Sequence, residues 1–140
     1  MTIAIINGPN LNLLGKREPE VYGAVSFDNF LPSLRERFKT VTIEYYQSNV
    51  EGELINEIQR AGFACDGIIL NPGGYTHTSV AIGDAVAAIK APVVEVHTSN
   101  VHAREEFRRH SFVSPKAAGI ICGLGLEGYV LALEWLTQRP

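Results

Sequence analysis

The sequence predicts an α/β fold in which a five-stranded parallel sheet is covered by helices on both faces. Five short runs of β-branched and other apolar residues read as strands that are buried on both faces. Segments with helical periodicity stand between these runs, and such alternation implies right-handed crossovers and a parallel sheet. The chain has 140 residues, of which 46% are apolar. That length and composition predict a single domain, residues 1–140, with a sizeable core.

The order of the strands predicts where a ligand binds. The expected strands are residues 2–6, 41–46, 67–70, 93–97 and 118–122. The simplest arrangement is a flavodoxin-like three-layer sandwich with strand order 2-1-3-4-5. In this order the chain reverses direction between strands 1 and 3, and ligands bind at the carboxyl ends of the strands at such a point. We therefore expect the functional residues in the loops after strands 1, 3 and 4.

Helices are expected between the strands, over residues 27–38, 50–61, 79–89 and 126–138, with a short charged helix near 103–108. Ser26 and Asn49 are the expected N-caps of the first two helices. Gly62 is expected to end the second helix. Pro32 interrupts the pattern of the first helix, which predicts either a kink or a start later than Ser26.

Composition excludes several classes of partner. The formal net charge is −3, which gives no positive field for nucleic acid or a membrane surface. The longest run of small and apolar residues, 117–126, is shorter than the ~18 residues that a membrane helix needs. Cys65 and Cys122 are far apart in apolar contexts, which predicts buried, reduced thiols. With no signal sequence at the start, we expect a cytoplasmic protein.

The first loop, at about residues 8–23, is the predicted active-site lid. It is longer than the roughly 2–6 residues that usually join a strand to a helix, and long ordered loops are commonly lids or binding loops. Arg17 lies five positions before Tyr22. A guanidinium beside a phenol favours the phenolate, which lets a tyrosine act as a base. A packing tyrosine and a solvated basic pair are the alternative interpretation.

Glu95 and His97 are a candidate acid–base pair at the end of the fourth strand. They lie two residues apart, so strand geometry places both side chains on one face of the sheet. A carboxylate beside an imidazole fixes its tautomer and favours its protonated form, which makes His97 a candidate general acid. A purely structural pair is the alternative.

Other polar residues near the strand ends suit a hydroxylated, carboxylate-bearing ligand. Asn71 both donates and accepts hydrogen bonds, and His77 directly precedes a helix. Thr98 and Ser99 add hydroxyl groups after the fourth strand, and Arg108 has the geometry to clamp a carboxylate. Turn formation, helix capping and a solvated charged face are the alternatives for these residues.

Several kinds of chemistry lack their usual patterns. The first loop contains neither a phosphate-binding Gly-x-x-x-x-Gly-Lys-Ser/Thr pattern nor Gly-x-Gly-x-x-Gly, and Ser99 does not lie in a Gly-x-Ser-x-Gly elbow. His97, His102 and His110 lack a recognised spacing of metal ligands. We therefore expect no cofactor and no metal. A non-catalytic flavodoxin-like ligand-binding domain and a hydrolase that uses Ser99 with His97 remain as alternatives.

Taken together, long motifs of this chain resemble those of type II 3-dehydroquinate dehydratases. They are NGPNLNLLG at 7–15, Arg17-Glu18-Pro19, Tyr22-Gly23, QSN at 47–49 and EGE at 51–53, NPG at 71–73 with YTHTS at 75–79, EVH at 95–97 with SNVHAREEFR at 99–108, and GLG at 123–125 with Gly-Tyr at 128–129. The resemblance covers essentially the whole chain. It implies dehydration of 3-dehydroquinate to 3-dehydroshikimate without cofactor or metal. It also implies a place in the shikimate pathway or in quinate catabolism, and a homododecamer built from trimers.

The same resemblance implies a role for each matching residue. Tyr22 matches the base and Arg17 the arginine that activates it. His97 matches the general acid with Glu95 behind it, and Asn10 matches the asparagine that helps to hold a water near the enolate. The positions that match substrate-binding residues are Asn71, His77, Thr98, Ser99 and Arg108.

Asp84 has two interpretations. Its place in the middle of the third helix predicts a solvated helix face. The resemblance implies instead that it approaches the site of a neighbouring subunit. Departures from the family pattern fall at Gly74, Val50 and Thr98, none of which carries the proposed proton transfers.

Overall fold

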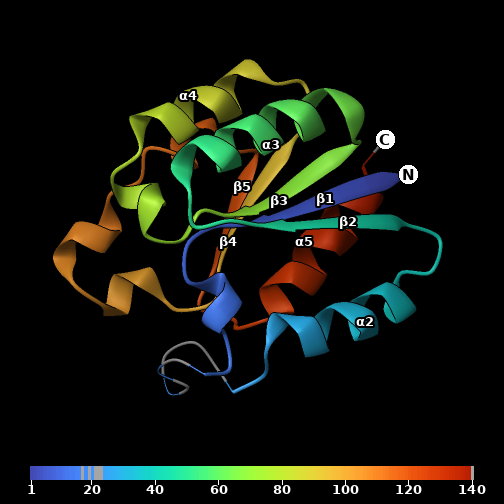
Figure 1. The fold of residues 1–140 in the computed structure, drawn as a ribbon, viewed down its shortest axis with the longest axis horizontal. Helices are drawn as coiled ribbons and strands as arrows, with labels where there is room; N and C mark the ends of the chain where they lie inside the picture. Colours follow the sequence, from blue (N-terminus) through green and yellow to red (C-terminus); the bar gives the residue numbers. More distant parts are fainter. Residues whose placement is uncertain (17, 19, 21–23, 140) are drawn as a thin grey trace.

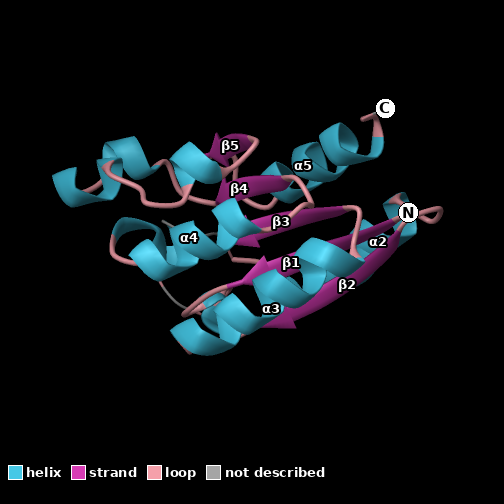
Figure 2. Cartoon of the chain, turned by 90° about the horizontal axis from the view of Figure 1, so that it is seen from above, coloured by secondary structure: helices cyan, strands magenta, loops and turns pink. Residues whose placement is uncertain are grey.

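All five predicted strands are present and form one parallel sheet. The computed structural model describes residues 1–16, 18, 20 and 24–139. The strands are β1 (Thr2–Asn7), β2 (Thr42–Gln47), β3 (Gly67–Asn71), β4 (Val93–His97) and β5 (Gly119–Cys122). Their order is β2-β1-β3-β4-β5, and neighbouring strands run parallel (Figure 2). The predicted flavodoxin-like sandwich is confirmed.

Helices cover both faces of this sheet. The helices are α2 (Phe27–Arg37), α3 (Glu51–Ala64), α4 (Val80–Ala88) and α5 (Glu127–Thr137). Figure 1 shows α3 and α4 over one face and α2 and α5 over the other. Every residue of β3 and β4 is buried between these layers. The uninterrupted apolar runs in the sequence therefore have a direct physical reason.

The core consists of two apolar clusters, one on each face of the sheet. Alternation along β1 sends Ile5 into the cluster beneath α2 and α5, and Ile6 into the cluster beneath α3 and α4. Phe27, Leu34 and Leu133 belong to the first cluster. These clusters fix the helices against the sheet, so the carboxyl ends of the strands have a rigid support.

The predicted start of the first helix is confirmed. Ser26 is the N-cap of α2, and its Oγ accepts a hydrogen bond of 3.2 Å from the backbone N–H of Asn29. Pro32 lies inside α2, which begins at Phe27. The alternative of a later start is therefore wrong.

Two predicted boundaries of α3 are wrong. Its N-cap is Val50, and no side chain caps it. Asn49 instead uses its Oδ1 to accept a 3.0 Å hydrogen bond from the backbone N–H of Asn10, a contact across the fold. Gly62 does not end the helix, which continues to Ala64. It is a packing position, since a Cβ there would lie 2.4 Å from the side chain of Ile89.

The segment after β4 also differs from its prediction. In place of one charged helix near 103–108, the chain forms two short 3₁₀ turns, η3 (Val101–Ala103) and η4 (Glu106–Arg109).

The burial of the two cysteines also differs from the prediction. Cys65 and Cys122 have free thiols, but both residues are only partly buried. None of the helices in the described part of the chain combines the length and apolar character that a membrane span requires.

Gly8 brings the loops after β1 and β3 into direct contact. Its backbone N–H donates a 2.7 Å hydrogen bond to the carbonyl oxygen of Asn71, and an added Cβ would lie 2.7 Å from the carbonyl oxygen of Pro72. A side chain at position 8 would force these loops apart. This junction is the predicted point where the winding of the sheet reverses.

Candidate active site

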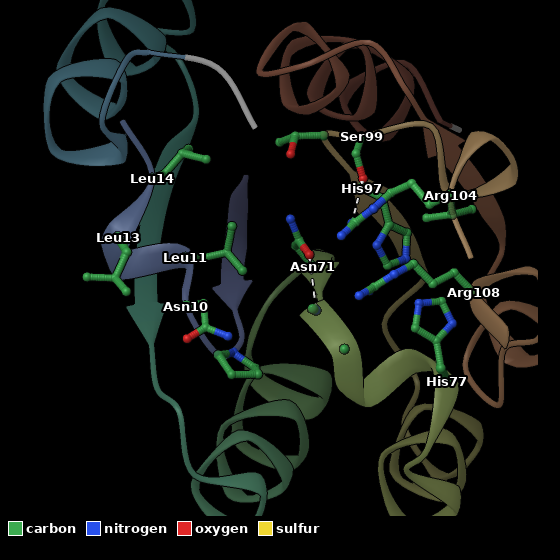
Figure 3. Close-up of a pocket in the computed structure, with 15 residues that line it drawn as sticks. Asn10, Leu11, Leu13, Leu14, Asn71, His77, His97, Ser99, Arg104 and Arg108 are labelled. Carbon is green, nitrogen blue, oxygen red and sulfur yellow. Dashed lines mark hydrogen bonds between the residues drawn. The ribbon is translucent and has the colours of Figure 1, made fainter. Parts of the chain in front are cut away.

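A cleft lies at the carboxyl ends of β1, β3 and β4, as the strand order predicts. Its volume is about 150 Å³. Figure 3 shows one wall with Asn10, Leu11, Leu13 and Leu14, and an opposite wall of polar side chains, with Asn71 between them. The structure brings together these predicted site residues in the lining: Asn10, Asn71, His77, His97, Thr98, Ser99 and Arg108.

The pair of Glu95 and His97 lies at the inner end of the polar wall. His97 Nε2 is 2.5 Å from Glu95 Oε2, and the two residues are 8% and 0% exposed. An ionised carboxylate only accepts hydrogen bonds, so Nε2 carries the hydrogen. Within the described residues Nδ1 has no hydrogen-bond partner, and it remains available to a ligand in the cleft. The predicted placement of both side chains on one face is confirmed.

Glu95 is held as an anion although it is fully buried. Burial raises the pKa of its carboxyl, but the hydrogen bond and charge of His97 and the hydroxyls of Ser114 and Thr76 lower it by more. The pKa of Glu95 is therefore below its ordinary value. The ionised carboxylate accepts the hydrogen of His97 Nε2 and so fixes the orientation of the ring.

The surroundings of His77 favour its neutral form. Burial lowers the pKa of His77, and the positive charges of His97 and Arg108 act in the same direction. Its Nδ1 lies 2.8 Å from the carbonyl oxygen of His110, which can only accept, so Nδ1 carries the hydrogen. Neutral His77 therefore offers Nε2 as an acceptor, which suits a hydroxyl group of a ligand.

A buried chain of hydrogen bonds orients Asn71. Its Nδ2 donates to the hydroxyl of Tyr129 at 3.0 Å, and its Oδ1 accepts from the N–H of Gly73 at 3.1 Å. The Tyr129 hydroxyl in turn donates to Asn7 Oδ1 at 2.8 Å. Burial raises the pKa of Tyr129 well above its ordinary value, so the phenol stays neutral and keeps its donor. One N–H of Asn71 is left without an acceptor among the described residues.

The cationic side of the cleft is built from η4 and the loop after β4. Arg108 donates through Nε to Glu105 Oε2 at 2.5 Å, which leaves its terminal nitrogens without a hydrogen bond among the described residues. Arg104 Nη1 donates to Ser99 Oγ at 3.3 Å. These groups form a positive wall with hydrogen-bond donors, which suits an anionic ligand. The terminal nitrogens of Arg108, rather than its Nε, are available to bind such a ligand.

Asn10 reaches the opposite wall through an unusual backbone conformation. Its φ of 71° lies in the left-handed region, where asparagine is among the few residues found without strain. Its backbone N–H is held by Asn49, as described above. This turn begins η1 (Leu11–Leu13), which carries the apolar wall of the cleft.

Comparisons with known proteins decide the family. The family model for class II dehydroquinases matches residues 1–137. A 3-dehydroquinate dehydratase of Roseiflexus castenholzii is 54% identical over 138 residues, which cover 97% of this chain and 88% of the relative. The chain belongs to the class II dehydroquinase family. As a member it is a type II 3-dehydroquinate dehydratase, a lyase.

Two further relatives agree with this family assignment. A catabolic 3-dehydroquinase of Aspergillus clavatus is 52% identical over 135 residues, 95% of this chain and 90% of the relative. The crystal structure of a type II dehydroquinase from Butyrivibrio crossotus superposes with a TM-score of 0.95 at 46% identity, covering 99% of this chain and 98% of that one. The fold and the resemblance predicted from sequence are both confirmed.

Some predicted site residues of this dehydroquinase are not among the described residues that line the cleft. Asp84 is exposed on α4 and does not line the cleft of its own chain. Arg17 and Tyr22 lie outside the described residues, so their roles stay predictions. Among the described residues no group of three or more His, Cys, Asp or Glu side chains has the arrangement of a metal site. Of the departures from the family pattern, Gly74 lines the cleft, where an added Cβ would meet nothing within 4 Å.

Sequence reasoning missed two hydroxyl groups that bond to Glu95 and a third that bonds to one of them. Thr76 Oγ1 and Ser114 Oγ each donate to its carboxylate at 2.5 Å, and Ser111 Oγ lies 2.7 Å from Thr76 Oγ1. Thr76 stands inside a motif that the sequence singles out. Ser114 is 19 positions from Glu95 in an irregular segment, so no periodicity or spacing connects the two. Arg104, a further lining residue, was visible only as part of a charged run.

Proposed function

We propose that this chain dehydrates 3-dehydroquinate to 3-dehydroshikimate through an enolate, with Tyr22 as the base and His97 as the general acid. The observation that carries the proposal is the contact of His97 Nε2 with the buried carboxylate of Glu95 at the cleft. It leaves Nδ1 as the proton donor toward the substrate. The substrate class follows from the family.

The reaction divides into two proton transfers. The Tyr22 phenolate removes a proton from the carbon next to the ketone, and the electron pair moves onto the ketone oxygen to give an enolate. The enolate then expels the hydroxyl group, which takes the Nδ1 proton of His97 and leaves as water. Afterwards Tyr22 is a neutral phenol and His97 a neutral imidazole, and proton exchange with solvent restores both.

Tyr22 needs a positive neighbour to act as a base. A free tyrosine has a pKa of about 10, and one guanidinium in a partly dry site lowers such a value by about 1–3 units. We assign this role to Arg17 on the loop of residues 8–23. Closure of that loop over the substrate would exclude water and strengthen the interaction.

The enolate is stabilised from the wall opposite His97. The amide of Asn10 lines that wall, and we propose that it holds an ordered water against the enolate oxygen. Leu11 and Leu14, which are nearly buried, keep this side of the cleft apolar. A low local dielectric strengthens the hydrogen bonds that oppose the developing charge.

The polar wall recognises the rest of the substrate. Asn71 offers one N–H and neutral His77 offers an acceptor, which together suit ring hydroxyl groups. Ser99, Thr98 and Arg108 lie on the cationic side, which suits the substrate carboxylate.

For the assembly, we propose a homododecamer built from trimers. The resemblance places Asp84 beside a neighbouring subunit, and the exposed position of this residue on α4 is compatible with such a contact. The physiological direction is either the shikimate pathway or quinate catabolism. Relatives carry both the name 3-dehydroquinate dehydratase and the name catabolic 3-dehydroquinase.

The experiment is an absorbance assay with purified protein and 3-dehydroquinate. The product is a conjugated enone, so ultraviolet absorbance rises as it forms. A His97→Ala variant is expected to lose this signal while it keeps the fold. If the unmodified chain bound the substrate without any rise in absorbance, the non-catalytic binding domain would be the better account.

A further inference from the structure

The carboxylate of Glu95 lies among hydroxyl groups that come from two separate segments. Thr76, on η2 (Gly73–His77), donates to Oε2, and Ser114, at the start of η5 (Ser114–Lys116), donates to Oε1. Oε2 also receives the hydrogen bond from His97. Thr76 is 1% exposed and Glu95 is fully buried. This arrangement is a built site for a buried anion.

The direction of each hydrogen bond in this cluster follows from its neighbours. Ser111 Oγ accepts from the backbone N–H groups of Val113 at 3.0 Å and Ser114 at 2.9 Å. Both of its lone pairs are then occupied, so its own hydrogen points to Thr76 Oγ1. Thr76 therefore receives one hydrogen and directs its own to Glu95.

Every group around Glu95 thus presents a hydrogen to it. A proton added to the carboxyl would face another hydrogen at each of its partners, so the cluster favours the ionised carboxylate. The same donors fix the orientation of the carboxylate plane. Oε2 is consequently kept against Nε2 of His97, and the other ring nitrogen is kept toward the cleft.

The segment of residues 110–114 is docked firmly against η2 and α4. The backbone N–H of Phe112 donates to the carbonyl oxygen of Thr76 at 2.8 Å, and His77 Nδ1 donates to the carbonyl oxygen of His110 at 2.8 Å. A Cβ at Gly83 of α4 would lie 2.3 Å from the carbonyl oxygen of Phe112. The hydroxyl groups of Ser111 and Ser114 therefore come from a segment that these contacts hold in place.

We propose that Thr76 and Ser114 are positioning residues for the dehydration, which keep Glu95 ionised and oriented so that His97 presents its Nδ1 proton to the substrate. Ser111 acts one step further away by orienting the Thr76 hydroxyl. The proposal rests on the proposed function, because it assigns these residues to the proton donor of that reaction.

Other titratable groups also face Glu95. His97 is on the same strand, His77 is on η2 and Cys122 is on β5. The charge of Glu95 acts on each of these three groups. A cavity of about 200 Å³ behind the pair is lined by Glu95 together with His102, Arg108 and Arg109. None of these groups is itself replaced in the variants of Thr76 or Ser114. A difference in pH dependence between matched variants therefore reports on the hydroxyl that was removed.

The experiment compares Thr76→Val with Thr76→Ser, and Ser114→Ala with Ser114→Thr. A hydrogen bond to a charged group is worth about one to two powers of ten in an equilibrium constant. We expect kcat to fall about 10- to 100-fold in Thr76→Val and Ser114→Ala with little change in KM. The acid limb of the pH profile is expected to move to higher pH, and the hydroxyl-bearing variants are expected to restore both. Thr78→Val is the matched control, since Thr78 is exposed and its hydroxyl has no partner among the described residues.

A second measurement does not depend on turnover. Nitrogen-15 NMR of His97 in the substrate-free protein reports which ring nitrogen carries the hydrogen and at which pH the ring titrates. We expect the hydrogen on Nε2 in the unmodified chain, and a changed titration in Thr76→Val and Ser114→Ala. If the chain failed to turn over 3-dehydroquinate, this titration would still decide the positioning role. Unchanged NMR titrations together with unchanged pH profiles in folded variants would overturn the proposal, as would equal defects in Thr76→Ser and Thr76→Val.

Discussion

His97 Nε2 and Glu95 Oε2 lie 2.5 Å apart at the end of β4, and the carboxylate is fully buried while the ring borders the cleft. This relationship joins the fold to the chemistry. A central parallel strand places both side chains on one face, and the sheet order opens that face onto the cleft. The proposed proton donor is thus positioned by a strand whose residues are all buried.

Replacing Glu95 by glutamine tests the charge of this pair. The Glu95→Gln variant retains nearly the same shape but loses the negative charge. The NH₂ group of its amide would also face groups that now donate hydrogen bonds to the carboxylate. Because general acid catalysis is worth about 10²–10⁴ in rate, we expect kcat to fall about 100-fold or more. Steady-state kinetics at neutral pH measures this. Glu44→Gln is the control, since Glu44 forms a surface pair with Arg60 and is expected to keep normal turnover.

The same carboxylate makes stability depend on pH. The pKa of Glu95 is lowered on folding from an ordinary value of 4.5. Its contribution is therefore fully present above about pH 4.5 and is lost as the pH falls through the lower value of the folded state. Thermal melts of the unmodified chain and Glu95→Gln between pH 7 and pH 3 should converge as the pH decreases. A constant difference in Tm over this range would show that Glu95 is not held as an anion.

Gly83 is predicted to matter although it lies outside the cleft. In Gly83→Ala the new Cβ would meet the carbonyl oxygen of Phe112 at 2.3 Å, so the segment that carries Ser111 and Ser114 has to move. We expect a loss of about 1–3 kcal/mol in the free energy of unfolding, together with a lower kcat. Chemical denaturation and kinetics measure the two effects. Gly52→Ala is the matched control, because a Cβ there meets nothing within 4 Å, and we expect it to keep activity and stability.

Tyr129→Phe tests the buried support of Asn71. The change removes the hydroxyl that accepts from Asn71 and donates to Asn7, so two buried amides lose a partner. We expect a loss of about 1–3 kcal/mol in the free energy of unfolding and a higher KM through the misoriented Asn71 amide. Tyr46→Phe, which removes a hydroxyl near the surface with only a 3.5 Å contact to Glu53, is expected to change neither quantity. Equal behaviour of the two variants would remove Tyr129 from the account.

The parts of this structure that sequence could predict are those with local or periodic causes. Strands buried on both faces leave unbroken apolar runs, and Ser26 caps the helix that directly follows it. Asn49 was assigned wrongly because its side chain is engaged by Asn10, which is distant in sequence. Ser111 and Ser114 reach Glu95 and Thr76 only through the docking of an irregular segment, and no local pattern encodes that docking. The pairing of Arg17 with Tyr22 stays a prediction.

The central claim is that one residue removes the proton and another releases the hydroxyl. Proton NMR in D₂O tests it by following the hydrogen next to the ketone of 3-dehydroquinate in the presence of His97→Ala. The account predicts that this hydrogen exchanges with solvent deuterium while almost no 3-dehydroshikimate forms, and that Tyr22→Phe abolishes both exchange and product. Product formation by His97→Ala at the rate of the unmodified chain, or exchange that persists in Tyr22→Phe, would contradict it.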